Sequence, residues 1–441
     1  MSSCLLRRVN LLQGPDSPPV RADVWIENGS LSRIEPLEGP SRQATGSPGT
    51  GAPPPAASDL PSITAERLWL GPSLVDPHSV LEDPLLGRAE TLSSLAAAAA
   101  SGGYGTLALL PWGASWRDRP ERLGLRWDPP LRLRLWGSFS SEGADQDLAP
   151  HAEQLACGAI GLAGGDAMVR LDLLERGLRL GEMGERPVLL APRDAALTQQ
   201  GFVRERIEAI RAGWPLDPPL SELLPLQQLL CLAQALPQRS LRLMNLSTLE
   251  AVHALGALQA PPMASVCWWH LVADSGRLDP ADEGWRVVPS LGGPDDREAL
   301  ISALAAGTLS AVSVQHVPLD AEERLLPLDQ RRPGLAGHGL VLPLLWQELV
   351  ERRGWSAQQL WQVLCWGPST FLGEEPERLT GGSRRWLLFD PERRWRWDRS
   401  RCRSLAANQP FWQEELRGAV LASGLSAARG WAWDLPGIPE C

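Results

Sequence analysis

The feature that most constrains the fold is an alternation of short apolar runs with longer helical stretches, which begins near Leu68. One run ends at Val75, a helical stretch leads from Glu90 through Ala100, and a second run covers 106–110. Such alternation is typical of a parallel sheet with crossover helices. Further units follow at 131–136, 158–162, 188–190, 241–243, 265–267 and 309–314. Their number predicts an eight-stranded barrel.

Both ends of the chain carry strand patterns instead. Residues 5–35 alternate apolar and polar positions around a turn at Asn28 and Gly29, and strand patterns return at 386–389 and 416–421. We therefore predict an α/β fold, a TIM-type (β/α)8 barrel over 71–375 with a small β-sandwich domain built from both chain ends, 1–70 and 376–441. The segment 39–60 is rich in Gly, Pro, Ser and Ala, which indicates a disordered insertion.

Charge and cysteine usage exclude several classes of function. The formal net charge of −10 would repel nucleic-acid phosphates and anionic membranes. No apolar run is long enough to span a membrane, and the seven cysteines are scattered and never form a CxxC pair. We expect a cytoplasmic protein with reduced thiols that binds neither nucleic acid nor membranes.

The chemistry of such a barrel lies at the carboxyl ends of its strands, so the residues after each apolar run matter most. The first run continues as VDPHSVLEDP over 75–84. This resembles the opening DxHxH motif of the dihydroorotases, and Asp76 and His78 match it. Val80 stands at the second histidine position and Glu82 at the position of a substrate-binding arginine.

The resemblance implies a protein of pyrimidine biosynthesis that opens or closes a cyclic amide with a zinc-bound hydroxide. Valine cannot bind zinc. A glutamate would repel the substrate carboxylate that the family arginine binds. The resemblance covers nearly the whole chain, because REAL at 297–300 and LFDP at 388–391 also match the family.

The next motifs depart from the family in the same way. LPW at 110–112, with the later Asp118, resembles MPNTxPxxD, and Trp112 replaces the asparagine that contacts substrate. LAGGD at 162–166 resembles FSDDG, so the metal-bridging carboxylate position is Gly164, or Asp166 if the alignment shifts by a residue or two. PVLLAPRD at 187–194 resembles PVIVHCED, with Ala191 at a ligand histidine.

The last motifs retain two histidines. LMNLST at 243–248 resembles ICHVST, with Asn245 at a zinc position, and VCWWHL at 266–271 resembles VTPHHL and keeps His270. VQHVPL at 314–319 resembles TDHAPH: it keeps His316 but has Gln315 at the catalytic aspartate, and a glutamine cannot transfer protons near neutral pH. The remaining departures are at a substrate-binding asparagine, a substrate-binding arginine and the final histidine: Val288, Gly292 and Leu319.

The absence of lysine excludes a binuclear site bridged by a carbamylated lysine. A mononuclear zinc site could use the remnant candidates His78 and His316 with Asp76 or Asp166. We favour the interpretation that these histidines, like His270, are scaffold residues. We also expect the rings of three tryptophans to fill the former pocket, the alternative being an apolar ligand pocket lined by Trp112, Trp268 and Trp269.

We therefore predict a catalytically inactive dihydroorotase-like protein that needs no cofactor and serves as a binding or assembly partner. By family analogy the partner is aspartate carbamoyltransferase, and a homodimer is a further expectation. The alternative is an active dihydroorotase or related zinc-dependent cyclic amidohydrolase acting on a cyclic C–N bond. A third hypothesis is sensing of a small ligand in the altered pocket.

Overall fold

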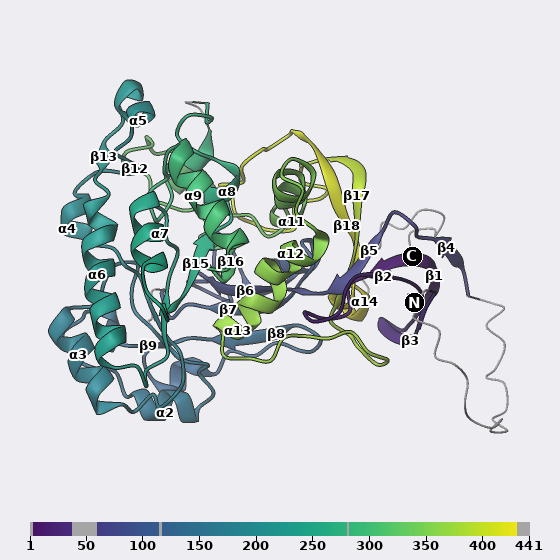
Figure 1. The fold of residues 1–441 in the computed structure, drawn as a ribbon, viewed down its shortest axis with the longest axis horizontal. Coiled ribbons are helices and arrows are strands. Elements are labelled where there is room, and N and C mark those ends of the chain that lie inside the picture. Colours follow the sequence, from purple (N-terminus) through teal and green to yellow (C-terminus); the bar gives the residue numbers. More distant parts are fainter. Residues whose placement is uncertain (1–2, 38–59, 114–116, 280–281, 430–441) are drawn as a thin grey trace.

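The computed structural model describes residues 3–37, 60–113, 117–279 and 282–429, and consists of a barrel with a sheet domain beside it (Figure 1). No helix in these ranges is both long enough and apolar enough to cross a membrane. The disordered insertion predicted for 39–60 falls, up to residue 59, outside the described residues.

Parallel strands form the barrel at eight positions. In chain order these are β6 (Leu74–Ser79), β7 (Tyr104–Leu109), β8 (Arg132–Leu135) continued by β9 (Gly137–Ser138), β10 (Leu162–Ala163), β11 (Val188–Leu190), β14 (Leu241–Leu243), β15 (Met263–Cys267) and β16 (Ala311–Ser313). The barrel closes between β16 and β6, where Val80 N donates to His316 O at 2.8 Å. The predicted barrel is confirmed.

Several of the barrel strands are buried on both faces. All six residues of β7 are buried, as are all six of β6, which explains the continuous apolar runs in the sequence. Helices cover the outside of the barrel (Figure 1). They include α1 (Leu92–Ser101), α2 (His151–Ala156), α3 (Leu171–Leu180), α6 (Leu220–Ala235), α7 (Leu249–Gly256), α8 (Trp269–Val272), α9 (Pro294–Ala305), α11 (Val341–Leu345), α12 (Ala357–Trp361) and α13 (Gly367–Phe371).

The helix α1 illustrates how the sequence sets these boundaries. Its N-cap is Thr91, whose side chain accepts a hydrogen bond from Ser94 N, so the helix begins two residues later than predicted. It ends at Gly102, and Gly103 has a φ of +81°, which lets the chain turn directly into β7. The helical stretch predicted to reach Ala100 therefore extends one residue further, to Ser101.

A seven-stranded sheet from both chain ends forms the small domain. Its order is β18-β17-β5-β1-β2-β3, with β4 paired to β1. Asn28 and Gly29 have φ of +50° and +76°, as a tight hairpin turn between β2 and β3 requires. Helix α14 (Gly424–Arg429) follows the last strand. The strands are β1 (Cys4–Leu11), β2 (Val20–Glu27), β3 (Ser30–Pro36), β4 (Ser62–Thr64), β5 (Trp69–Pro72), β17 (Trp386–Arg396) and β18 (Glu415–Ser423).

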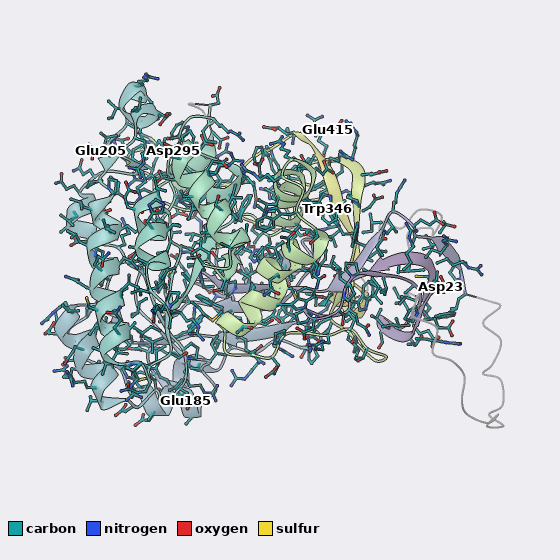
Figure 2. The ribbon with its side chains drawn as sticks, in the orientation of Figure 1. Asp23, Glu185, Glu205, Asp295, Trp346 and Glu415 are labelled. Carbon is teal, nitrogen blue, oxygen red and sulfur yellow. The ribbon has the colours of Figure 1, made fainter. Side chains whose placement is uncertain are left out.

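Aromatic rings join the barrel to this sheet. Trp346, directly after α11, has its ring centroid 5.6 Å from that of Trp69 on β5 and 5.2 Å from that of Phe389 on β17 (Figure 2). Tilted ring pairs at such distances add to the burial of apolar surface. Trp346 therefore fixes the small sheet against a barrel helix.

An excursion between β11 and α6 was not predicted. It contains α4 (Ala195–Thr198), β12 (Val203–Arg204), α5 (Ile207–Ala212) and β13 (Leu216–Asp217), and β12 pairs with β13 in parallel. Phe202 and Trp285 form part of a small separate core beneath it. The excursion matters for the site because it carries Arg204 to the barrel mouth.

Candidate functional site at the barrel mouth

A cavity of about 190 Å³ lies at the carboxyl ends of the barrel strands. A narrower pocket of about 20 Å³ shares four of its lining residues: Trp112, Asp166, Val288 and Gln315. The two spaces together occupy the place where the sequence motifs put the substrate and the metal. The walls are mainly apolar, with Val80, Cys267, Val287, Val317 and Leu335 among them.

The three tryptophans of the sequence motifs, Trp112, Trp268 and Trp269, differ in whether they lie in the core or line the cavity. Trp268 and Trp269 are fully buried in the core, as expected, and Trp269 Nε1 donates to Gly284 O at 2.9 Å. Trp112 instead lines the cavity, and its Nε1 donates to Gly164 O at 2.9 Å. The prediction that aromatic rings fill the former pocket is therefore wrong for Trp112, whose ring forms part of an open wall.

His78 is completely buried and both of its ring nitrogens have partners. Nδ1 lies 2.7 Å from Gln315 Oε1, and Nε2 lies 2.9 Å from Ser265 Oγ. Burial lowers the pKa of His78 to about 4, although the nearby charge of Asp76 opposes the shift. The imidazole is neutral at pH 7, with Nδ1 donating to the glutamine and Nε2 accepting from the serine.

Gln315 and Asn245, which replace the catalytic aspartate and a zinc histidine of the family motifs, share an unusual backbone conformation. Their φ values are +48° and +50°. Asn245 Oδ1 accepts from Ser313 Oγ at 2.7 Å, whereas its buried Nδ2 has no hydrogen-bond partner. Asn245 Nδ2 is therefore a buried hydrogen-bond donor without an acceptor.

Asp76 is buried and paired with a histidine that the sequence analysis left out. His338 Nε2 lies 2.9 Å from Asp76 Oδ2, and Val314 N donates to Asp76 Oδ1 at 3.1 Å. His338 had no motif around it, so the pairing could be recognised only from the structure. Burial lowers the pKa of His338, and the hydrogen bond to Asp76 opposes that shift.

His316 has a different acidic partner. Its Nε2 lies 3.1 Å from Glu90 Oε2, and its ring centroid lies 4.9 Å from that of His338. Glu90 also accepts hydrogen bonds from Ser404 Oγ and, at 3.1 Å, from Leu405 N. Burial raises the pKa of Glu90, but hydrogen bonds led by that from His316 outweigh it and the net shift is downward. Through these contacts, Glu90 connects the end of β16 with the start of α1 and with the C-terminal segment.

The charged residues at the rim of the cavity are paired. Glu82 forms an ion pair with Arg332, which also contacts Glu323 at 3.1 Å. Asp166 is exposed and lies 3.3 Å from Arg193 Nη1. Asp166 is therefore on the open side of the cavity, while His78 and His316 are buried among other partners.

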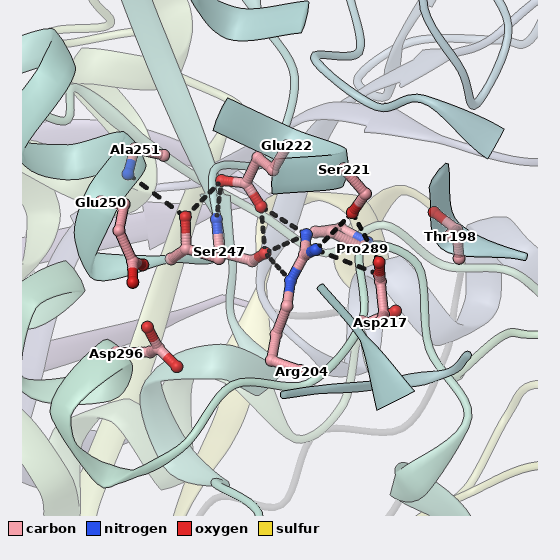
Figure 3. A network of polar contacts seen from close by, with 12 residues as sticks. Thr198, Arg204, Asp217, Ser221, Glu222, Ser247, Glu250, Ala251, Pro289 and Asp296 are labelled. Atoms are coloured by element: carbon pink, nitrogen blue, oxygen red, sulfur yellow. Dashed lines mark hydrogen bonds and ion pairs between the residues drawn. The ribbon is translucent and has the colours of Figure 1, made fainter. Parts of the chain in front are cut away.

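A buried network surrounds Arg204 at the floor of the narrow pocket (Figure 3). The fully buried guanidinium lies 3.0 Å from Asp217 Oδ2 and 2.5 Å from Glu222 Oε2. It also donates to Ser221 Oγ at 2.8 Å and to Ser247 Oγ at 3.0 Å. Burial raises the pKa of Glu222, and the charge of Arg204 opposes the shift. No sequence motif indicated this network, because its members are far apart and resemble surface charges.

The other motif positions are structural. His270 Nε2 lies 3.1 Å from Pro289 O, and burial lowers its pKa to about 4. Asp194 caps α4 by accepting from Ala196 N at 2.8 Å. Buried side chains that cannot bind a metal stand at further ligand positions: Ala191 and Leu319.

These residues do not fit a zinc site. His78 has both ring nitrogens in buried hydrogen bonds, and His316 Nε2 contacts Glu90. Among the residues whose positions are described, no three His, Cys, Asp or Glu side chains converge as a ligand set. Catalytic zinc needs three such ligands and one open position.

Comparison with known proteins gives the family. No family model matches the chain. A protein of Synechocystis sp. named "Probable dihydroorotase-like protein" is 32% identical over 409 residues, which cover 83% of this chain and 90% of that protein. The chain belongs to the dihydroorotase-like family. A dihydroorotase of Syntrophobacter fumaroxidans is 26% identical over 430 residues, covering 95% of this chain and 94% of that enzyme.

Solved structures support the fold of this dihydroorotase-like chain. The L-hydantoinase (dihydropyrimidinase) from Arthrobacter aurescens superposes with a TM-score of 0.75 at 18% identity, covering 96% of this chain and 97% of that one. The dihydropyrimidinase from Brevibacillus agri gives a TM-score of 0.72 at 18% identity, with coverages of 95% and 93%. At such identities the likeness concerns the fold alone.

Proposed function

We propose that this dihydroorotase-like chain is a non-catalytic member of its family that acts in the cytoplasm as a binding or assembly partner. The observation that carries the proposal is the state of His78. Both of its nitrogens are engaged in a buried environment: Nδ1 donates to Gln315 Oε1, and the one lone pair, on Nε2, accepts from Ser265 Oγ. Zinc binding at Nε2 would require the buried hydrogen bond from Ser265 to break.

The neighbouring substitutions support the same proposal. Gln315 holds the position of the proton-transfer aspartate and instead accepts a hydrogen bond from His78. Glu82 already pairs with Arg332, and its carboxylate would repel an anionic substrate. Binding of the substrate carboxylate, activation of water and transfer of protons would each need a group that these positions lack.

For the partner we propose aspartate carbamoyltransferase, on the ground of family analogy. Exposed leucines on two loops beside the cavity provide apolar surface for a protein contact: Leu85, Leu86, Leu325 and Leu326. Arg88 contacts Asp320 at 3.2 Å and Glu322 at 2.7 Å, which holds the two loops together. A contact through this surface would cover the barrel mouth, where a working enzyme must admit its substrate.

The test is co-purification with aspartate carbamoyltransferase from the same source at micromolar concentration. A stable complex is expected, and Leu86→Glu combined with Leu325→Glu is expected to disrupt it. The matched control is Leu180→Glu on α3, since Leu180 is also exposed but lies at the end of an outer helix. Absence of any complex with the unmodified chain would contradict the proposed partner.

A further inference from the structure

The cavity has the properties of a binding site for a ligand different from the anionic substrate of the family. Its volume of about 190 Å³ leaves room for roughly a dozen water molecules. Trp112 provides a flat aromatic wall, held in place by its hydrogen bond to Gly164 O. Val80 and Val288 add apolar surface. These walls suit a flat ring of modest polarity.

The charges around the cavity exclude a ligand that carries a net charge. Each ionised side chain in the lining already has an oppositely charged neighbour, in three pairs: Glu82 with Arg332, Asp166 with Arg193, and Glu222 with Arg204. Cys267 also lines the cavity, and burial raises the pKa of its thiol to about 12, so it is neutral. A bound carboxylate would find no free countercharge and would face the glutamate.

Two donors at the narrow end of the cavity have no acceptor. Asn245 Nδ2 is buried and unpartnered, whereas Oδ1 of the same amide accepts from Ser313 Oγ at 2.7 Å. Arg193 Nε is likewise buried and unpartnered, and both residues line the narrow pocket. A buried donor without a partner is costly, so a ligand carbonyl at this position would be stabilised.

From these contacts we infer that the cavity binds an uncharged, flat heterocycle bearing carbonyl groups, which stacks on Trp112 and accepts hydrogen bonds from Asn245 and Arg193. This inference rests on the proposed non-catalytic function, since the ligand is held without being converted. The chain would then sense the uncharged ring and reject its carboxylated counterpart. The preference for the uncharged ring arises because the cations of the lining are already paired and because Glu82 would repel a carboxylate.

The test compares uracil with orotate, which is the same ring bearing a carboxylate, by isothermal titration calorimetry of the full chain. Uracil is expected to bind with a Kd below about 1 mM and orotate at least about tenfold more weakly. Trp112→Leu is expected to weaken uracil binding by about fivefold or more. Trp25→Leu, on β2 of the small sheet, serves as the matched control and is expected to change nothing.

A second variant keeps the test independent of folding. Glu82→Gln removes the carboxylate beside Arg332, so orotate is expected to gain affinity relative to uracil, whereas Glu35→Gln in the exposed pair with Arg33 leaves the ratio unchanged. Equal or tighter binding of orotate to the unmodified chain would overturn the inference, as would no heat with either compound. A parallel sample incubated with dihydroorotate and analysed by chromatography separates the two proposals. A ring-opened product would contradict the proposed function, whereas absent binding of uracil would contradict only the proposed ligand.

Discussion

Replacement of Arg204 by methionine is expected to destabilise the protein by about 3–5 kcal/mol. The guanidinium is fully buried and is the countercharge of two buried carboxylates, those of Asp217 and Glu222. Methionine nearly fills the same volume but supplies no charge and no donor. Both acids would then remain buried without a countercharge, although they would keep the hydrogen bonds from Ser221 and Ser247.

The magnitude follows from the contacts that disappear. Two charge-assisted hydrogen bonds, to Asp217 and Glu222, contribute about 1.5–3 kcal/mol each. Burial already raises the pKa of Glu222, so protonation of that carboxyl would relieve part of the cost. The remaining loss is a large fraction of the roughly 5–15 kcal/mol that stabilises a typical folded domain.

Urea unfolding followed by circular dichroism at pH 7 measures the effect. The control is Arg179→Met, which breaks an exposed pair with Glu175 on α3 and is expected to cost less than about 0.5 kcal/mol. Adding Glu222→Gln to Arg204→Met should recover part of the loss, because one uncompensated charge disappears. A loss below about 1 kcal/mol for Arg204→Met would refute the view that this network is desolvated and tightly paired.

Two further predictions concern pH. Because burial lowers the pKa of His78 and His270 from 6.5 to about 4, the unfolded chain binds more protons than the folded one between those values. Their contribution to the free energy of unfolding is complete above about pH 6.5 and decreases as the pH falls toward 4. In urea titrations at several pH values, the free energy of unfolding of His78→Asn should therefore decrease less steeply over this range than that of the unmodified chain. Identical slopes would contradict a lowered pKa for His78. Glu222 acts in the opposite sense, because its folded pKa lies above 4.5, so its contribution to stability falls as the pH rises above about 4.5. The stability of the unmodified chain relative to Glu222→Gln is therefore expected to be lower at pH 7 than at pH 4.5, and the reverse order would count against a desolvated carboxyl.

Periodicity predicted most of the fold because barrel strands such as β7 are buried on both faces, whereas a terminal strand such as β2 is buried on one. That difference makes β7 a continuous apolar run and β2 an alternating one. The excursion carrying α5 was missed because Ile207 and Ile210 of that helix are largely exposed, so no apolar face marks it. Local signals cannot report a segment that contributes little to the main core.

The candidate site was predictable where a residue stands in a recognisable motif, and not where partners come from distant segments. The motif around His78 gave its position, but not that Ser265 would occupy its second nitrogen. His338 and Glu90 carry no motif, yet each pairs with a residue of the strand-end motifs. The sequence left open whether Trp112 fills the former pocket or lines a cavity, because side-chain direction depends on the loop that carries it.

The proposed function requires that this barrel mouth neither holds zinc nor turns over a cyclic amide. The most direct measurement is zinc content per chain after purification with added zinc, together with a dihydroorotate hydrolysis assay on the same sample. The dihydroorotase of Syntrophobacter fumaroxidans is a suitable positive control, since it is similar over 95% of this chain. We expect substoichiometric zinc and no turnover; about one zinc per chain with hydrolysis that disappears in His78→Ala would contradict the account.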